Sequence, residues 1–120
     1  MAPKFEIVQD EEGKFRFHFK DDEGQVRLRS LPFKSKINAQ TAVAKMRDLL
    51  LREEHVVRHS RPGGEFFFTV KNQNGEVVAR SEFADSESRL ESLVASVRES
   101  AKGAALIDLT SKASKRLAHR

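Results

Sequence analysis

The sequence of 120 residues contains no cysteine. Disulfide bonds, thiolate metal ligands and a cysteine nucleophile are therefore excluded. No stretch approaches the roughly 20 apolar residues that a membrane-spanning helix needs. The first residues, Met1–Lys4, run directly into a strand-like segment and lack the apolar region of a secretory signal peptide. We therefore expect no membrane partner and a cytoplasmic location.

Motifs of the common enzyme classes are also missing. The glycines of Pro62–Gly64 open no helix, as those of a phosphate-binding loop would, and there is no nucleophile elbow. His55 and His59 are four residues apart on a predicted strand, but no third ligand lies near them. The acidic segment Asp21–Gly24 lacks the alternating oxygen ligands of a calcium loop. The sequence predicts a protein without catalysis, metal or cofactor.

The positive charge of the chain is concentrated at its end. The net charge is +4, and residues 111–120 contain four Lys or Arg and no acidic residue, which leaves 18 basic and 18 acidic residues elsewhere. We expect residues 111–120 to be a disordered basic tail. Lys112, Lys115 and Arg116 either bind a phosphate backbone or are simply solvated.

The sequence does contain an internal repeat at an offset of 51 residues. The segment Lys14–Lys20 (KFRFHFK) aligns with Glu65–Lys71 (EFFFTVK). The same offset aligns Gly24 with Gly75, Val26 with Val77, Arg29 with Arg80, Ser35 with Ser86, and Arg47 with Arg98. Each copy of such a repeat buries its apolar face against the other. We therefore expect two half-sized units that share one core.

Strands are predicted in the first half of each unit. Phenylalanine alternates with polar residues over Phe15–Lys20, which indicates a strand with one buried face. A turn at Asp21–Gly24 and a second alternating segment at Gln25–Arg29 complete a hairpin. Upstream, Phe5–Val8 predicts a further strand, which makes a three-stranded meander.

A helix and a last strand follow. Ser35 is a suitable helix cap, and apolar residues recur at three- and four-residue spacing over Ala39–Leu50. Glu54–Arg58 suits a short closing strand, and Arg61–Gly64 is the sharpest break in the chain. The second unit repeats this order with a strand at Phe66–Val70, a turn at Asn72–Gly75, a strand at Val77–Ala79, a helix over Leu90–Ala101 and a closing strand at Ala105–Leu109.

These elements predict an α+β protein of two tandem β(3)-α-β repeats. The repeats share a single antiparallel sheet, and both helices cover one face of it. The first repeat spans residues 1–60, a linker spans 61–64, and the second repeat spans 65–110 with a core shared with the first. Residues 111–120 form the tail.

The order and spacing of these segments resemble the YegP-like family of small bacterial proteins, whose function is uncharacterised. The matching segments are Lys14–Phe17, Lys20, Gly24, Ser30, Phe33, Ser35, Glu65–Lys71, Asn74–Val78, Ser81–Glu82, Ser96–Arg98 and Ile107–Thr110. The resemblance implies a tandem of three strands, a helix and a strand, joined into one sheet with exchanged last strands. The chain departs from the family pattern locally, for example at Asp22–Glu23, which replaces the usual Asn before Gly24. The resemblance implies no catalytic or ligand residues.

The sheet face away from the helices is the candidate functional surface. We expect Arg16, His18, Lys20, Arg27 and Arg29 on it in the first unit, and Phe67, Thr69, Lys71, Val78 and Arg80 in the second. Cations beside an aromatic ring on an open sheet allow bases to stack while phosphates are held.

Two other interpretations of this face remain. It is a plain solvated surface, or it is part of a structural or protein-interaction module that self-associates through the sheet face or an edge strand. The chain is then a monomer or a homodimer. Of the residues expected on this face, the apolar Phe67 is the one that a purely solvated surface accounts for least well.

Overall fold

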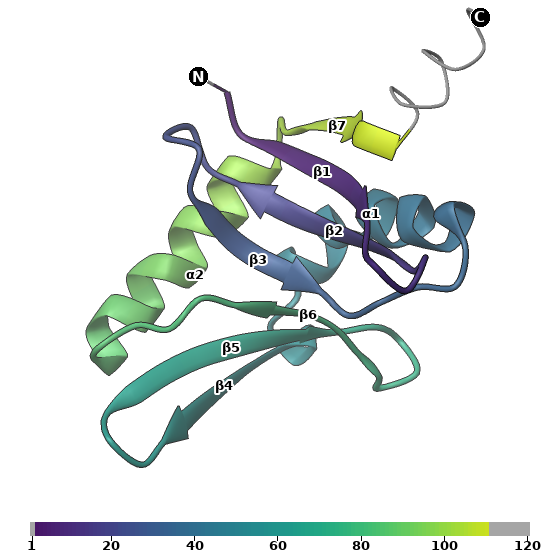
Figure 1. The fold of residues 1–120 in the computed structure, drawn as a ribbon. Coiled ribbons are helices and arrows are strands. Elements are labelled where there is room, and N and C mark those ends of the chain that lie inside the picture. The colour runs from purple at the N-terminus through teal and green to yellow at the C-terminus, as the bar shows by residue number, and fades with distance from the viewer. Residues whose placement is uncertain (1, 111–120) are drawn as a thin grey trace, which may run out of the picture.

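The computed structural model describes residues 2–110 and has seven strands and two main helices. The strands form one sheet in the order β4-β5-β6-β3-β2-β1-β7 (Figure 1). Their bounds are β1 (Lys4–Gln9), β2 (Phe15–Lys20), β3 (Val26–Ser30), β4 (Val56–Arg61), β5 (Glu65–Lys71), β6 (Val77–Ser81) and β7 (Ala105–Asp108). The helices are α1 (Lys36–Leu51), α2 (Glu87–Ala101) and a short 3-10 turn, η1 (Glu53–His55). The predicted tail, with Lys112, Lys115 and Arg116, lies outside the described residues.

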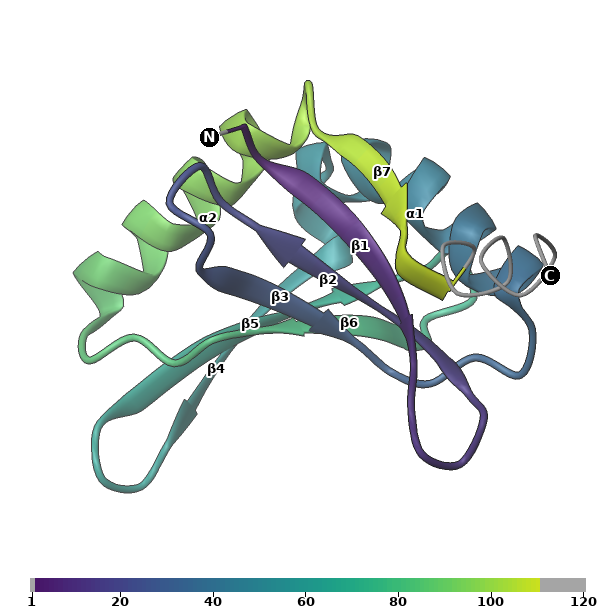
Figure 2. The same cartoon turned by 45° about the horizontal axis from the view of Figure 1, so that its top comes forward.

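The sheet is arched, and both α-helices lie on its upper side in Figure 2. The α+β class, the single sheet and the placement of both helices on one face are thus confirmed. Within the described part of the chain, no helix has the length and apolar content to cross a membrane. The long axis of the molecule is 52 Å.

One detail of the prediction was wrong. The sheet is mixed rather than antiparallel, because β7 pairs in parallel with β1 after α2 has crossed the sheet. Residues 61–64, the predicted linker, form the turn of the β4–β5 hairpin. Gly63 and Gly64 both have positive φ, so this Pro-Gly-Gly sequence makes a tight turn.

Each predicted closing strand pairs with the other repeat, β4 with β5 and β7 with β1, as the resemblance implied. The 51-residue offset also places β1 on β4, and β7 lies at the far edge of the sheet. The two repeats meet where β3 pairs with β6, with Arg29 directly opposite Arg80. Because these arginines are equivalent in the repeat, the approximate twofold axis of the fold passes through this pair.

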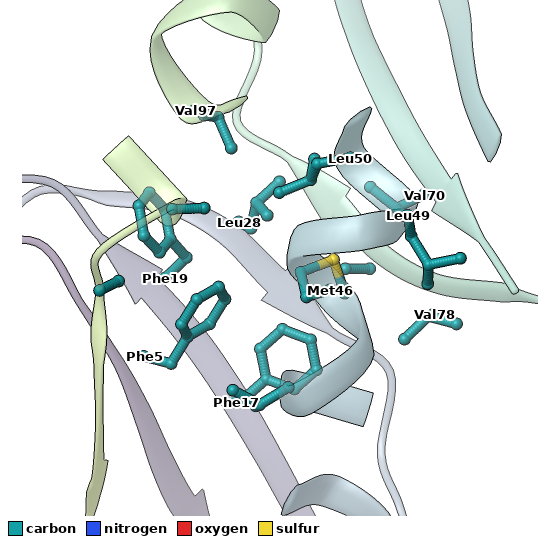
Figure 3. Packing of buried hydrophobic residues seen from close by; sticks show 14 of the residues in the cluster. Phe5, Phe17, Phe19, Leu28, Met46, Leu49, Leu50, Val70, Val78 and Val97 are labelled. Carbon is teal, nitrogen blue, oxygen red and sulfur yellow. The ribbon is translucent and has the colours of Figure 1, made fainter. Parts of the chain in front are cut away.

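The core lies between the sheet and the helices (Figure 3). Phe5, Phe17, Phe19 and Phe68 are fully buried, and Met46 of α1 packs among them. Burying one such side chain stabilises the fold by about 1.5–3 kcal/mol. The predicted alternation in β2 and β5 therefore places apolar side chains on one face of the sheet, and the helices bury that face.

A β-bulge in each repeat changes which residues reach the open face. The register shifts between Phe19 and Lys20 and, at the equivalent place, between Val70 and Lys71, so Arg27 and Val78 are extra residues on β3 and β6. Val78 is consequently buried with the core. Arg27 lines a groove with Arg89, Ser92 and Ser96 of α2. The prediction that Arg27 and Val78 lie on the open face was therefore wrong.

Each helix is capped by an arginine of the other helix. Arg47 of α1 donates to the carbonyl of Ala101 over 2.8 Å and to the carbonyl of Ala104. Arg98 of α2 donates to the carbonyl of Leu50 over 2.5 Å. The last carbonyls of a helix lack partners within it and attract cations. This reciprocal pair therefore ties the two repeats together at the carboxyl ends of their helices.

Candidate functional site on the open sheet face

The open face is the sheet surface opposite α1 and α2. A row of side chains crosses its centre from strand to strand, in the register Glu6, His18, Arg29, Arg80 and Thr69. Their neighbours along each strand point to the helices, as the burial of Phe17, Phe19, Leu28 and Ala79 shows. The row therefore spans both repeats across four central strands and β1.

Three of the predicted cations are neutralised by neighbouring acids. The pairs are Arg16 with Asp10 at 3.3 Å, Lys20 with Glu6 at 2.8 Å, and Arg27 with both Asp21, at 2.7 Å, and Glu82. A hydrogen bond from the backbone N–H of Lys14, helped by Arg16, lowers the pKa of Asp10 and keeps it ionised. The predicted basic patch is therefore smaller than the count of basic residues suggested.

The remaining predicted cations are Arg29, Arg80 and Lys71. Within residues 2–110, none of the three has an acidic partner. Arg29 and Arg80 are exposed, and Lys71 is half-buried. The free positive charge of the open face is thus centred on the junction between the repeats.

Phe67 belongs to an aromatic cluster at the β4–β5 end of the open face, which we define as His59, Phe67 and Phe83. The rings of His59 and Phe67 are stacked, 4.7 Å apart, and Phe83 meets Phe67 edge-on at 5.5 Å. Phe67 is half-buried, whereas Phe83 is 42% exposed. One side of Phe67 is thus covered by His59, and Phe83 offers the more accessible ring.

Two arginines border the aromatic cluster. The guanidinium carbon of Arg80 lies 5.9 Å from the centres of both Phe67 and Phe83, and that of Arg61 lies 5.3 Å from Phe83. These distances are within the range of cation–π attraction. The cluster therefore combines accessible aromatic surface with positive charge.

The two histidines of the open face have different surroundings. Burial, followed by the charge of Arg29, lowers the pKa of His18. His59 lies 3.0 Å from the hydroxyl of Thr69 through its Nε2 atom. Among the described residues, no three His, Asp or Glu side chains are grouped to hold a metal ion. His59 thus contributes to stacking and hydrogen bonding.

Sequence reasoning missed Phe83, His59 and Arg61 as members of this site. Phe83 follows β6, and the repeat offset places it on Pro32, so the duplication gave no signal for it. The hairpin register sets His59 opposite Phe67, a relation that required the β4–β5 turn to be recognised. The aromatic cluster is therefore specific to the second repeat.

The edge strand β7 is a second surface with exposed apolar residues. Leu106 and Ile107 are 41% and 39% exposed, and neighbouring Ile37 at the start of α1 is 71% exposed. Among the described strands, β7 pairs with β1 alone. Its outer edge carries backbone groups that can pair with another strand.

Comparisons with known proteins place this fold among bacterial relatives. The family described as "Domain of unknown function (DUF1508)" matches residues 10–49 and 63–108. The UPF0339 protein YegP of Escherichia coli K12 is 31% identical over 99 residues, which cover 82% of this chain and 89% of YegP. The UPF0339 protein PA0329 of Pseudomonas aeruginosa is 30% identical, over 90% of this chain and 98% of its own.

Solved structures show the same fold. The solution structure of YegP from E. coli, a protein of unknown function, superimposes with a TM-score of 0.84 at 27% identity, over 91% of this chain and 94% of YegP. The UPF0339 protein SO3888 of Shewanella oneidensis gives a TM-score of 0.84 at 21% identity, over 91% of this chain and 92% of its own. The predicted resemblance to YegP-like proteins is confirmed.

Proposed function

The chain belongs to the DUF1508 family, whose function is unknown, and from that premise and the geometry of its open face we propose that it is a non-catalytic binding protein for single-stranded nucleic acid. The proposal includes action in the cytoplasm, as the sequence led us to expect. Its binding surface is the open face, with the aromatic cluster at one end and the unpaired arginines at the centre.

The observation that supports this proposal most strongly is the aromatic cluster beside Arg61 and Arg80. Sequence-tolerant binding of single strands combines cations for the backbone with aromatic rings for the bases. Open sheets with surface aromatics serve RNA recognition in this way. Stacking on one ring is worth about 1–3 kcal/mol per base, so Phe83, with its exposed ring, would supply much of the affinity.

The test is fluorescence anisotropy with a labelled single-stranded oligouridylate, its DNA counterpart and a duplex of the same length. We expect the full chain to bind single strands more tightly than the duplex. Phe83→Ala should weaken binding roughly 5- to 100-fold, the equivalent of losing one stacked base. The matched control is Leu106→Ala, which removes an exposed apolar side chain from the opposite edge and should leave affinity unchanged.

A further variant separates the contribution of the open face to binding from that of the tail. In this variant Lys112, Lys115 and Arg116 are all replaced by Gln. Binding that this variant retains and Phe83→Ala weakens would support the open face. Binding that disappears with the three tail charges, or that Phe83→Ala and Leu106→Ala leave equal, would contradict the proposal.

The exposed residues of β7 favour a second candidate, a protein-interaction module. A second copy or another chain could add a strand to the outer edge of β7, with Leu106 and Ile107 covered in the contact. Sedimentation velocity would then show a dimer that Leu106→Asp dissociates and Phe83→Ala does not affect. A monomer at all concentrations would argue against self-association through this edge.

A further inference from the structure

We infer that Arg29 and Arg80 together form a binding site for one phosphate group at the centre of the open face. The inference deepens the proposed function and rests on it for the source of the phosphate, which would be the backbone of the bound strand. It depends on a pair of cations at the repeat junction, whereas the proposed function depends mainly on the aromatic cluster.

Arg29 and Arg80 carry like charges at paired positions and repel each other. They are directly opposite each other on antiparallel strands, where β-carbons are about 5 Å apart, and like charges in such positions destabilise a sheet. In the part of the chain that the structure describes, neither guanidinium has an acidic partner or a hydrogen-bond acceptor. Local conflicts of this kind are expected at functional sites, where a ligand relieves them.

The contrast with other arginines of the sheet strengthens the argument. Unlike Arg29 and Arg80, Arg16 and Arg27 are each held by a carboxylate. The nearest acid in the central row, Glu6, is on β1 beyond His18 and is bound by Lys20 at 2.8 Å. The charge at the junction is thus left unbalanced while its surroundings are neutralised.

Arg80 is oriented by two aromatic rings. Its guanidinium carbon lies 5.9 Å from the ring centres of Phe67 and Phe83, so that two aromatic side chains restrict its position. Its N–H donors remain without an acceptor among residues 2–110. A guanidinium presents its donors in a planar fork that matches two phosphate oxygens. Arg29 supplies a second fork from the opposite strand.

The aromatic cluster and the arginine pair are connected through Arg80. A strand with a base on Phe83 would therefore bring its backbone toward the repeat junction. A phosphodiester of that strand would then lie between Arg29 and Arg80. Both arginines are exposed to solvent, so a phosphate group can reach them.

His18 provides an internal reporter for the site. It is opposite Arg29 on β2 and is faced by Glu6 from β1, while Arg16 and Lys20 flank it on its own strand. Burial and the charge of Arg29 lower its pKa. A bound anion beside Arg29 would offset that charge, and the pKa of His18 should rise.

The experiment compares Arg29→Gln and Arg80→Gln with the matched control Arg52→Gln, which removes an exposed arginine from the end of α1. Anisotropy with the single-stranded oligouridylate is measured over a range of salt concentrations. Each test variant should weaken binding roughly tenfold, as expected for a lost charge-assisted contact. Each should also reduce the slope of log affinity against log salt by about 0.7. Arg52→Gln should change neither quantity.

A second measurement uses inorganic phosphate and the NMR titration of the His18 ring. We expect phosphate to raise the pKa of His18 in the full chain and not in Arg29→Gln. Oligonucleotide binding that Arg29→Gln and Arg80→Gln leave unchanged, in affinity and salt slope, would overturn the inference and leave the proposed function standing.

The experiments also distinguish a failure of the proposed function from a failure of the phosphate site. If the chain binds no oligonucleotide but phosphate raises the pKa of His18 through Arg29, the proposed function fails and the phosphate site stands, with a free phosphate compound as its source. If phosphate leaves His18 unchanged and no oligonucleotide binds, both are overturned.

Discussion

Replacing Arg47 by methionine tests how the two repeats are joined. Methionine keeps the apolar stem of the side chain and removes the guanidinium, which donates to the carbonyl of Ala101 at the end of α2 and to that of Ala104 just after it. The reciprocal change, Arg98→Met, removes the donor to the carbonyl of Leu50 at the end of α1 and a partner of Glu53. Both changes leave the core residues in place.

The magnitude follows from the contacts. Hydrogen bonds to a charged group contribute about 1.5–3 kcal/mol net. Water can replace part of that at carbonyls near the surface, and the Arg98 side chain is 25% exposed. We therefore expect each variant to lower the free energy of unfolding by about 2 kcal/mol. The double variant should lose about 4 kcal/mol if the two sites act independently.

The assay is urea unfolding followed by far-UV circular dichroism, because the sequence has no Trp or Tyr to provide a fluorescence signal. With a urea m value of about 2 kcal/mol per molar, each single variant should lower the midpoint by about 1 M. Arg47→Lys should recover part of the loss, since lysine keeps the charge but not the fork.

The control is Lys102→Met, which removes a cation from the same end of α2. Lys102 is exposed and pairs with Glu99 at 3.2 Å, so its loss should cost under about 0.5 kcal/mol. An Arg47→Met variant no less stable than Lys102→Met would refute the reasoning that reciprocal capping joins the repeats.

Two further predictions concern the pH dependence of stability and the buried hydroxyl of Ser81. Hydrogen bonds from Arg58 and Arg98 lower the pKa of Glu53 to about 2 in the folded chain, so its contribution to stability is present above its unfolded pKa near 4.5 and is lost as the pH falls toward 2. Glu53→Gln should flatten the decline of the thermal midpoint over that range, and an unchanged pH profile would contradict this. Ser81→Ala should lower the free energy of unfolding by about 1–3 kcal/mol, because the buried N–H of Phe68 donates to its hydroxyl over 2.9 Å and would lose its acceptor. Urea unfolding would measure that loss, and a variant as stable as the original chain would show that the N–H finds another acceptor.

Much of the fold could be predicted from the sequence because the repeat and the alternation act on every residue of a strand. The alternating phenylalanines over Phe15–Lys20 fixed which side of β2 faces the helices, and the offset then placed Phe66–Val70 in the same way. The helix cap Ser35 also lies where its sequence context indicates, with its hydroxyl accepting from Asn38. These features depend on local patterns, which a sequence displays directly.

The features that could not be predicted depend on register and on contacts between distant residues. A bulge adds one residue and turns Arg27 away from the face that simple alternation gave it. The acids that neutralise Arg16 and Lys20 reach them from a loop and from the neighbouring strand. The parallel direction of β7 depends on where α2 ends. Simple alternation therefore predicted the open face but placed Arg27 and Val78 on it wrongly. The binding role of this face stays a prediction.

The pairing of β1 with β7 has a consequence for how the chain folds during synthesis. Lys4 pairs with Ala105 and Ile7 with Asp108, so the earliest strand receives its outer neighbour only when the final strand has been made. Contacts between residues so distant in sequence slow folding. We expect the first repeat to leave the ribosome with one edge of β1 unpaired, a surface open to association with other chains. Completion of the sheet, and protection from such association, then require the synthesis of β7.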